Sequence, residues 1–243
     1  MSIKRKLLSL SSNKRELLKG SYQAAVLKIL GLLISYIFII FISRNYGAEA
    51  VGIYQISIQL MTFFATLSLF GFNQSIIRFT ADFLKKDKLN EVKSLLKFFT
   101  LLSFIFSLLL SFFVHIYATS LSVLLFKTAE YTLIFQMAAF FIPVLTLNNL
   151  FIEFIRGLNK IKTSEFLRLF SIKFINLFSF LSMIYYIEYN NFLPIISFEI
   201  GVLLTFFLTL YFIIKYTKQL KTTIANKKEL NKKELNKKEL NKK

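Results

Sequence analysis

The chain contains no cysteine and a single histidine, His115. The absence of thiols excludes disulfides, thiolate nucleophiles and sulfur-ligated metals, and one imidazole is too few for a histidine cluster around zinc. The same shortage argues against the usual catalytic triads. The sequence therefore predicts a protein that is not an enzyme, with no catalytic residue, no metal site and no cofactor.

Helix-breaking residues are also scarce, with 7 Gly and 2 Pro in 243 residues, while 55% of the residues are hydrophobic and 30 are Phe. A transmembrane helix needs about 20 consecutive apolar residues, whereas barrel strands alternate apolar and polar positions. Continuous apolar stretches of the helical length indicate an all-α, polytopic membrane protein with six spans. We place the spans at residues 23–43, 53–75, 98–118, 131–155, 166–187 and 192–214.

Acidic residues are few as well, 13 against 31 Lys and Arg, for a formal charge of +18. Arg44 and Lys127 are the basic residues of the predicted outer loops, and the inner loops and both ends hold most of the others. Because cytoplasmic loops of membrane proteins are enriched in Lys and Arg, we expect both termini in the cytoplasm and a multi-pass protein of the cell inner (cytoplasmic) membrane. The charge is thus an orientation signal and does not predict a nucleic-acid partner.

Three regions are expected along the chain. Residues 1–22 form a basic cytoplasmic N-terminal segment, residues 23–215 the six-helix bundle, and residues 216–243 a basic low-complexity cytoplasmic tail. The tail repeats Asn-Lys-Lys-Glu-Leu three times between Asn226 and Leu240. Leucines five residues apart form no stripe on a helix, so we expect a solvated tail without regular structure, close to anionic lipid headgroups.

Polar residues recur at helical spacing within four of the spans. Small and hydroxyl residues let membrane helices pack closely, so we interpret the stripes of the third and sixth spans as packing faces. Gln, Asn and Glu are costlier to bury, so the second and fourth spans are predicted to line a hydrated cavity. The stripes are Gln55, Gln59, Thr62, Thr66 and Asn73 (second), Thr100, Ser103, Ser107, Ser111 and His115 (third), Gln136, Pro143, Thr146, Asn149, Glu153 and Arg156 (fourth), and Ser197, Gly201, Thr205 and Thr209 (sixth).

Two lysines lie within the spans. Lys28 is near the cytoplasmic edge of the first span, on one face with Gly31 and Ser35. Lys173 lies about 13 Å into the fifth span, less than a turn from Asn176, where an unpaired charge costs about 2.5–3.5 kcal/mol. Such a charge requires water, a ligand or a counter-ion, and Glu199 of the sixth span is the candidate counter-ion.

Other charges are expected to have local roles. Glu153 precedes Arg156 by three residues, the spacing of an ion pair on one helix. Arg168 lies close to the inner boundary, where a long side chain reaches the headgroups.

Short motifs connect the chain to a known family. The first outer loop reads Arg44-Asn-Tyr-Gly47-Ala-Glu-Ala-Val-Gly52-Ile-Tyr54, the second span ends Gly71-Phe-Asn-Gln-Ser-Ile-Ile-Arg78, and the fourth ends Phe154-Ile-Arg156-Gly157. With these motifs the chain resembles the polysaccharide flippases, exporters of lipid-linked oligosaccharides that are related to the multidrug and toxin exporters. The resemblance extends over roughly residues 15 to 215.

The resemblance implies a transporter without covalent chemistry, and a fold in which this six-helix bundle is one lobe of a two-lobed exporter. Its substrate would be a polyprenyl-diphosphate-linked oligosaccharide, held in a cationic cavity while the polyprenyl tail stays among membrane lipids. A second six-helix half or a second copy of the chain would complete it. The predicted substrate-binding residues are Lys28, Lys173, Gln55, Gln59, Asn149 and Asn176.

Other functions remain open from sequence. The chain could be half of a multidrug or small-cation exporter of the same superfamily, or a non-transporting assembly partner or remnant. Acidic residues in the cavity would favour a cation as substrate, and deep lysines favour an anionic head. The glycan, the coupling ion and the oligomeric state are not encoded in any pattern of the sequence.

Overall fold

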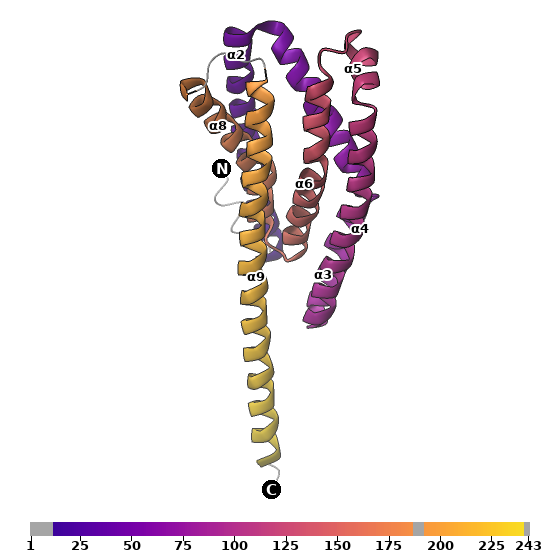
Figure 1. Cartoon of the computed structure of the whole chain (residues 1–243). Coiled ribbons are helices and arrows are strands. Elements are labelled where there is room, and N and C mark those ends of the chain that lie inside the picture. The colour runs from indigo at the N-terminus through magenta and orange to yellow at the C-terminus, as the bar shows by residue number, and fades with distance from the viewer. Residues whose placement is uncertain (1–11, 187–191, 241–243) are drawn as a thin grey trace, which may run out of the picture.

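The computed structural model describes the backbone of residues 12–186 and 192–240, and the side chains of residues 22–186 and 192–222. The described backbone is helical almost throughout and contains no strand. Figure 1 shows its elements: α2 (Ser12–Ser68), α3 (Phe72–Lys85), α4 (Leu89–Ile116), α5 (Ala118–Phe126), α6 (Thr132–Gly157), α7 (Ile161–Phe166), the π-helix η1 (Leu167–Ser171), α8 (Ile172–Tyr186) and α9 (Leu193–Leu240).

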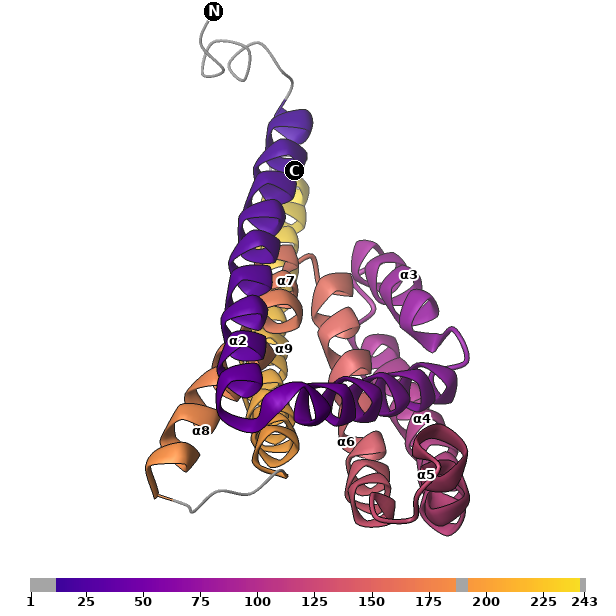
Figure 2. The same cartoon turned by 90° about the horizontal axis from the view of Figure 1, so that it is seen from above.

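Helix α2 consists of two arms that meet at Gly47, whose φ of 82° and ψ of 177° are not helical. The chain turns sharply between the arms (Figure 2), and glycine adopts this backbone conformation without the steric cost of a Cβ atom. Gly47 of the first motif is therefore the turn between the first two spans. Gly52, the other glycine of that motif, lies inside the second arm, and no atom of a described residue beyond its own helix backbone and chain neighbours lies within 4 Å of a Cβ atom built on it.

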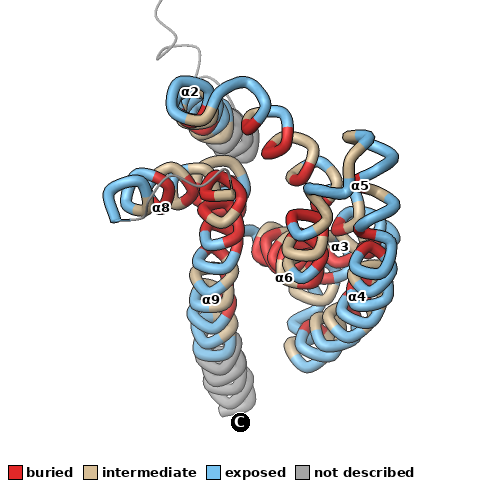
Figure 3. Tube along the Cα trace, turned by 45° about the horizontal axis from the view of Figure 1, so that its top comes forward, coloured by how far each residue is buried: buried red, intermediate tan, exposed pale blue. Residues whose placement is uncertain are grey.

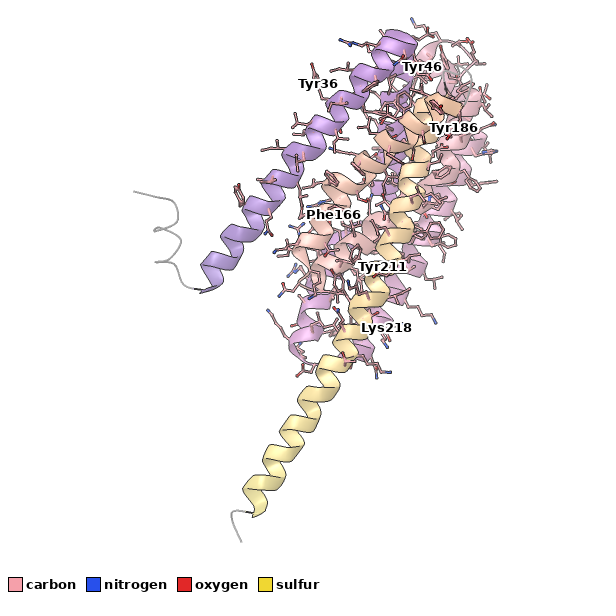
Figure 4. All side chains as sticks on the ribbon, turned by 90° about the vertical axis from the view of Figure 1, so that its left-hand side faces the viewer. Tyr36, Tyr46, Phe166, Tyr186, Tyr211 and Lys218 are labelled. Carbon is pink, nitrogen blue, oxygen red and sulfur yellow. The ribbon has the colours of Figure 1, made fainter. Side chains whose placement is uncertain are left out.

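Five described helices are long and apolar enough to cross a membrane. The first of them contains both arms of α2, so its bend allows six crossings. Figure 4 shows the start of α2 and the far end of α9 both directed toward the lower side of the view, as six crossings require. The six-span, all-α prediction is confirmed.

The second span ends earlier than predicted. Phe70 and Gly71 adopt positive φ angles of 45° and 80°, which stop the second arm at Ser68. The residues that we assigned to the end of this span begin α3 instead. This short helix packs on α6, where a Cβ atom at Gly157 would lie 3.2 Å from the Cα of Ile77 and 2.9 Å from the Cβ of Thr80. The second and third sequence motifs thus meet at one helix crossing.

Helix α6 forms the centre of the bundle (Figure 3) and carries seven of the twelve largest fully buried side chains of the described residues. Pro143 in its middle has no N–H, so the carbonyl of Ala139 loses its usual helical donor. Ser111 of α4 donates a hydrogen bond to that carbonyl at 2.6 Å. A polar group freed by proline inside the membrane is therefore satisfied by a neighbouring helix.

The small-residue stripe of α9 is a packing face, as predicted. Ser197, Gly201, Thr205 and Thr209 are all buried. A Cβ atom at Gly201 would lie 3.2 Å from the carbonyl oxygen of Ile172 in α8. Thr209 donates a hydrogen bond to Asn148 of α6 at 2.9 Å. The third span behaves in the same way, because Ser103 and Ser107 are buried.

The expectation of an irregular tail was wrong. Helix α9 continues through the repeats to Leu240 as one straight rod (Figure 1). Lysine, glutamate and leucine all have high helix propensity, and each Glu of the repeat precedes a Lys by four residues, a spacing that stabilises isolated helices. Absence of a hydrophobic stripe therefore did not imply absence of a helix.

Candidate functional site

The second arm of α2 leads from one pocket to another. Pocket 1, of about 230 Å³, lies where both arms of α2 meet α8 and α9. Pocket 2, of about 200 Å³, lies at the other end of the second arm, against α3, α6 and η1. Gln55 lines the first pocket and Thr66 the second, and the exposed Gln59 and Thr62 lie between them along the arm.

Lys173 is the charged residue in the lining of pocket 1. It is half-buried, and no carboxylate among the described residues forms an ion pair with it. The pair with Glu199 that we kept open from sequence is not formed. Glu199 is 3% exposed and its Oε1 atom has no hydrogen-bond partner in the described part of the chain. The sequence made Glu199 a candidate counter-ion because the two residues lie within neighbouring spans. Their side chains point in different directions from α8 and α9 and do not make contact.

Asn176, one turn beyond Lys173, joins three helices. Its amide nitrogen donates to the Tyr54 hydroxyl of α2 at 3.0 Å, and its amide oxygen accepts from Ser197 of α9 at 2.8 Å. Both ends of the amide are therefore engaged within the protein, although the residue lines pocket 1. Asn176 fixes the walls around Lys173, and its predicted contact with substrate stays a prediction.

Lys173 is the second residue after the π-helical turn η1, which packs against the first arm of α2. A Cβ atom built on Gly31 would lie 2.1 Å from the carbonyl oxygen of Leu169 in η1 and 3.3 Å from Cδ of Lys173. Only a glycine allows the two backbones to approach this closely. Single π turns often mark functional sites, and this one sets the start of α8 against the lysine's pocket.

The rest of the first arm contributes less than predicted. Ser35 lines pocket 1, but Lys28 is exposed and does not. Figure 4 shows that the first arm of α2 separates from the other helices as it approaches its N-terminal end, and that the exposed Tyr36 lies on its outer side.

Pocket 2 contains Asn73, Asn149, Glu153 and Arg168. The Glu153–Arg156 pair is present at 3.8 Å, but Glu153 approaches Arg168 more closely, at 3.1 Å. Arg168 also binds Glu165 at 2.5 Å. We expected Arg168 to reach the headgroups, and it instead joins α6 to η1 and α7. Its i, i+3 spacing from Glu165 was the sequence signal that could have revealed this.

The predicted site residues thus divide between two places. Gln55, Lys173 and Asn176 come together in pocket 1, and Asn149 lies in pocket 2. Gln59 is exposed between the pockets, and Lys28 is exposed on the first arm. Sequence reasoning missed Tyr54 and Ser197 as partners of Asn176, because hydrogen bonds between distant segments depend on helix rotation.

The family described as "Polysaccharide biosynthesis protein" matches residues 17–232. The chain belongs to this family. The resemblance drawn from the three motifs is thereby confirmed, and so is membership of the flippase and exporter superfamily. Among curated proteins no significant match is found. A solved structure, the crystal structure of a MATE point mutant, is similar with a TM-score of 0.73 and 12% sequence identity. The match covers 88% of the present chain and 48% of the MATE chain. The chain therefore has a MATE-like fold and spans about half the length of the protein that it matches.

Proposed function

We propose that the chain forms one lobe of a flippase that moves lipid-linked oligosaccharide from the cytoplasmic to the outer leaflet. The observation that carries this proposal is Lys173, a half-buried cation in a pocket with amide and hydroxyl groups and no paired carboxylate among the described residues. A diphosphate is the complementary charge. The apolar lining of Phe38, Ile39 and Ile58 keeps water scarce around it, which strengthens the attraction.

A second lobe completes the transporter in this proposal. The chain spans 48% of the matched MATE chain, and alternating access in two-lobed transporters requires one bundle to rock against another. The uncharged stripe of Gln55, Gln59 and Thr62 would then face the central cavity. Either a separate chain or a second copy can supply the other lobe, and we expect the 243-residue chain alone not to flip lipid.

Binding of farnesyl diphosphate to the purified chain in nanodiscs tests the role of Lys173. We expect Lys173→Gln to weaken binding about tenfold or more, equivalent to at least about 1.4 kcal/mol, and to leave farnesol binding unchanged. Lys97→Gln, at an exposed lysine outside both pockets, is the matched control. Equal affinity of Lys173→Gln and the unaltered chain for farnesyl diphosphate would show that the diphosphate does not bind in pocket 1.

The alternatives make different predictions in the same assay. A cation exporter would bind tetraphenylphosphonium more tightly after Lys173→Gln, since the variant lacks the repelling charge. A non-transporting partner would bind neither probe. Liposomes containing a fluorescent polyprenyl-diphosphate disaccharide test the two-lobe arrangement, and rapid flipping by the chain alone, as a monomer, would contradict it.

A further inference from the structure

Pocket 2 holds more hydrogen-bonding groups than the protein itself uses. Glu153 accepts from Arg168 through Oε1. Its buried Oε2 atom lies 3.8 Å from Arg156 Nη1 but accepts no hydrogen bond in the described part of the chain. The half-buried side-chain amides of Asn73 and Asn149 line the pocket and form no hydrogen bond within that part either. A buried polar atom is normally satisfied, so Oε2 of Glu153 requires water or a ligand, and the two amides are available to the same molecule.

The charges around the pocket cancel. Glu153 and Glu165 face Arg156 and Arg168, with N–O distances from 2.5 to 3.8 Å. A phosphate entering the pocket would approach the carboxylate of Glu153, while the guanidinium of Arg168 is already engaged with two carboxylates. A cation would meet two guanidinium groups. Neither kind of ion gains the uncompensated attraction that Lys173 offers in pocket 1.

A neutral hydroxyl group fits this set of partners. It can donate to Oε2 of Glu153, which accepts no other hydrogen bond in the described part of the chain, and accept from the amides of Asn73 and Asn149, so that each group is satisfied without a change in charge. Room is available for several such groups, because about 200 Å³ is the bulk volume of roughly six or seven waters. One monosaccharide ring carries several hydroxyls within a volume of this order.

We propose that pocket 2 is a subsite for a neutral sugar. The inference rests on the proposed function, and it adds that the glycan extends away from the diphosphate along α2. Gln55 and Thr66 are 11 residues apart, about 16 Å along the helix, so one ring cannot fill both pockets. The exposed Gln59 and Thr62 offer uncharged polar contacts between them.

Protection of single cysteines tests the subsite independently of transport. The chain has no native cysteine, and Thr66 and Ser35 are matched positions, one at each pocket. Within the described residues the Thr66 hydroxyl donates to the Thr62 carbonyl and the Ser35 hydroxyl to the Gly31 carbonyl, each on its own helix. Replacing either hydroxyl therefore removes no ligand contact of the proposal. Thr66→Cys and Ser35→Cys chains in nanodiscs are labelled with a small methanethiosulfonate reagent, with glucose, galactose, N-acetylglucosamine, inorganic phosphate or tetramethylammonium present.

We expect at least one of the three neutral sugars to slow labelling at position 66 more than phosphate or tetramethylammonium does. Asn149→Ala should weaken that protection about fivefold, as the loss of one hydrogen bond predicts. Glu153→Gln removes one carboxylate, and phosphate should then protect position 66. Failure of all three sugars, stronger protection by phosphate in the unaltered pocket, or full protection in the Asn149→Ala chain would overturn the proposal.

Protection of the Ser35→Cys thiol by farnesyl diphosphate tests the proposed function separately. Protection by sugar at position 66 without protection by farnesyl diphosphate at position 35 would reject the diphosphate site and keep the sugar subsite. The opposite pattern would reject the subsite alone.

Discussion

Gly31→Ala should destabilise the bundle, because it separates the first arm of α2 from η1. The new Cβ atom would lie 2.1 Å from the Leu169 oxygen, and ordinary contact begins at 3.4 Å. The two backbones must therefore move apart by roughly an ångström, or the π turn must change. Overpacking of this kind costs about 1–3 kcal/mol. The better helix propensity of alanine offsets about 0.5–1 kcal/mol of this, so the expected net loss of unfolding free energy is up to about 2.5 kcal/mol.

Gly52→Ala provides the control on the other arm of the same helix. Nothing lies within 4 Å of its added Cβ atom, so this variant should gain up to about 1 kcal/mol from helix propensity alone. Ser103 is fully buried and gives the reporter, since a single Ser103→Cys thiol reacts only when the bundle opens. Its labelling rate across a sodium dodecyl sulfate titration measures the free energy of opening.

If Gly31→Ala is as stable as Gly52→Ala, the close contact with Leu169 does not exist and the π turn is not held by α2. Loss of stability should also widen pocket 1, because Ser35 and Phe38 on the same arm form part of its wall.

Three further outcomes are expected. Ser111→Ala should lower the free energy of unfolding by about 0.6–1.7 kcal/mol, because the Ala139 carbonyl loses its hydrogen-bond donor. In a Pro143→Ala background the helix supplies that donor again, so Ser111→Ala should leave the stability unchanged there. A loss of the same size in both backgrounds would contradict this. Arg168→Gln should destabilise the chain more than Arg156→Gln, since Arg168 lies at 2.5 and 3.1 Å from its carboxylates and Arg156 at 3.8 Å, and urea or detergent titration ranks the two. In intact cells an impermeant thiol reagent should label Ala129→Cys but not Lys160→Cys until the membrane is permeabilised, and the reverse result would invert the topology.

Hydropathy predicted the number of spans because burial in lipid depends on length and composition, which any window of sequence contains. The boundaries were less accurate where backbone conformation decides them, as at Phe70 and Gly71. The small-residue stripes of α4 and α9 were correctly assigned to packing, since close approach of helices requires small side chains whatever the neighbour. Such features are local, and the sequence carries them directly.

Contacts between segments were harder to predict. Depth along a helix placed Lys173 near Glu199, yet depth says nothing about the direction in which each side chain points. Arg168 was assigned to the headgroups because its carboxylate partner on α6 lies 15 residues away across a turn. The exposed Gln59 shows the same limit, because a polar stripe identifies a face and does not say whether a pocket covers it.

The length of α9 has a practical consequence for measuring motion. At about 1.5 Å per residue its 48 residues make a rod of roughly 70 Å, of which only about 30 Å crosses the hydrocarbon. Its distal end lies roughly 55 Å from the membrane centre, so each degree of tilt displaces that end by about 1 Å. Because the helix converts a small rotation of the lobe into a displacement of several ångströms at its end, a spectroscopic label near Leu240 would make that rotation measurable as a distance.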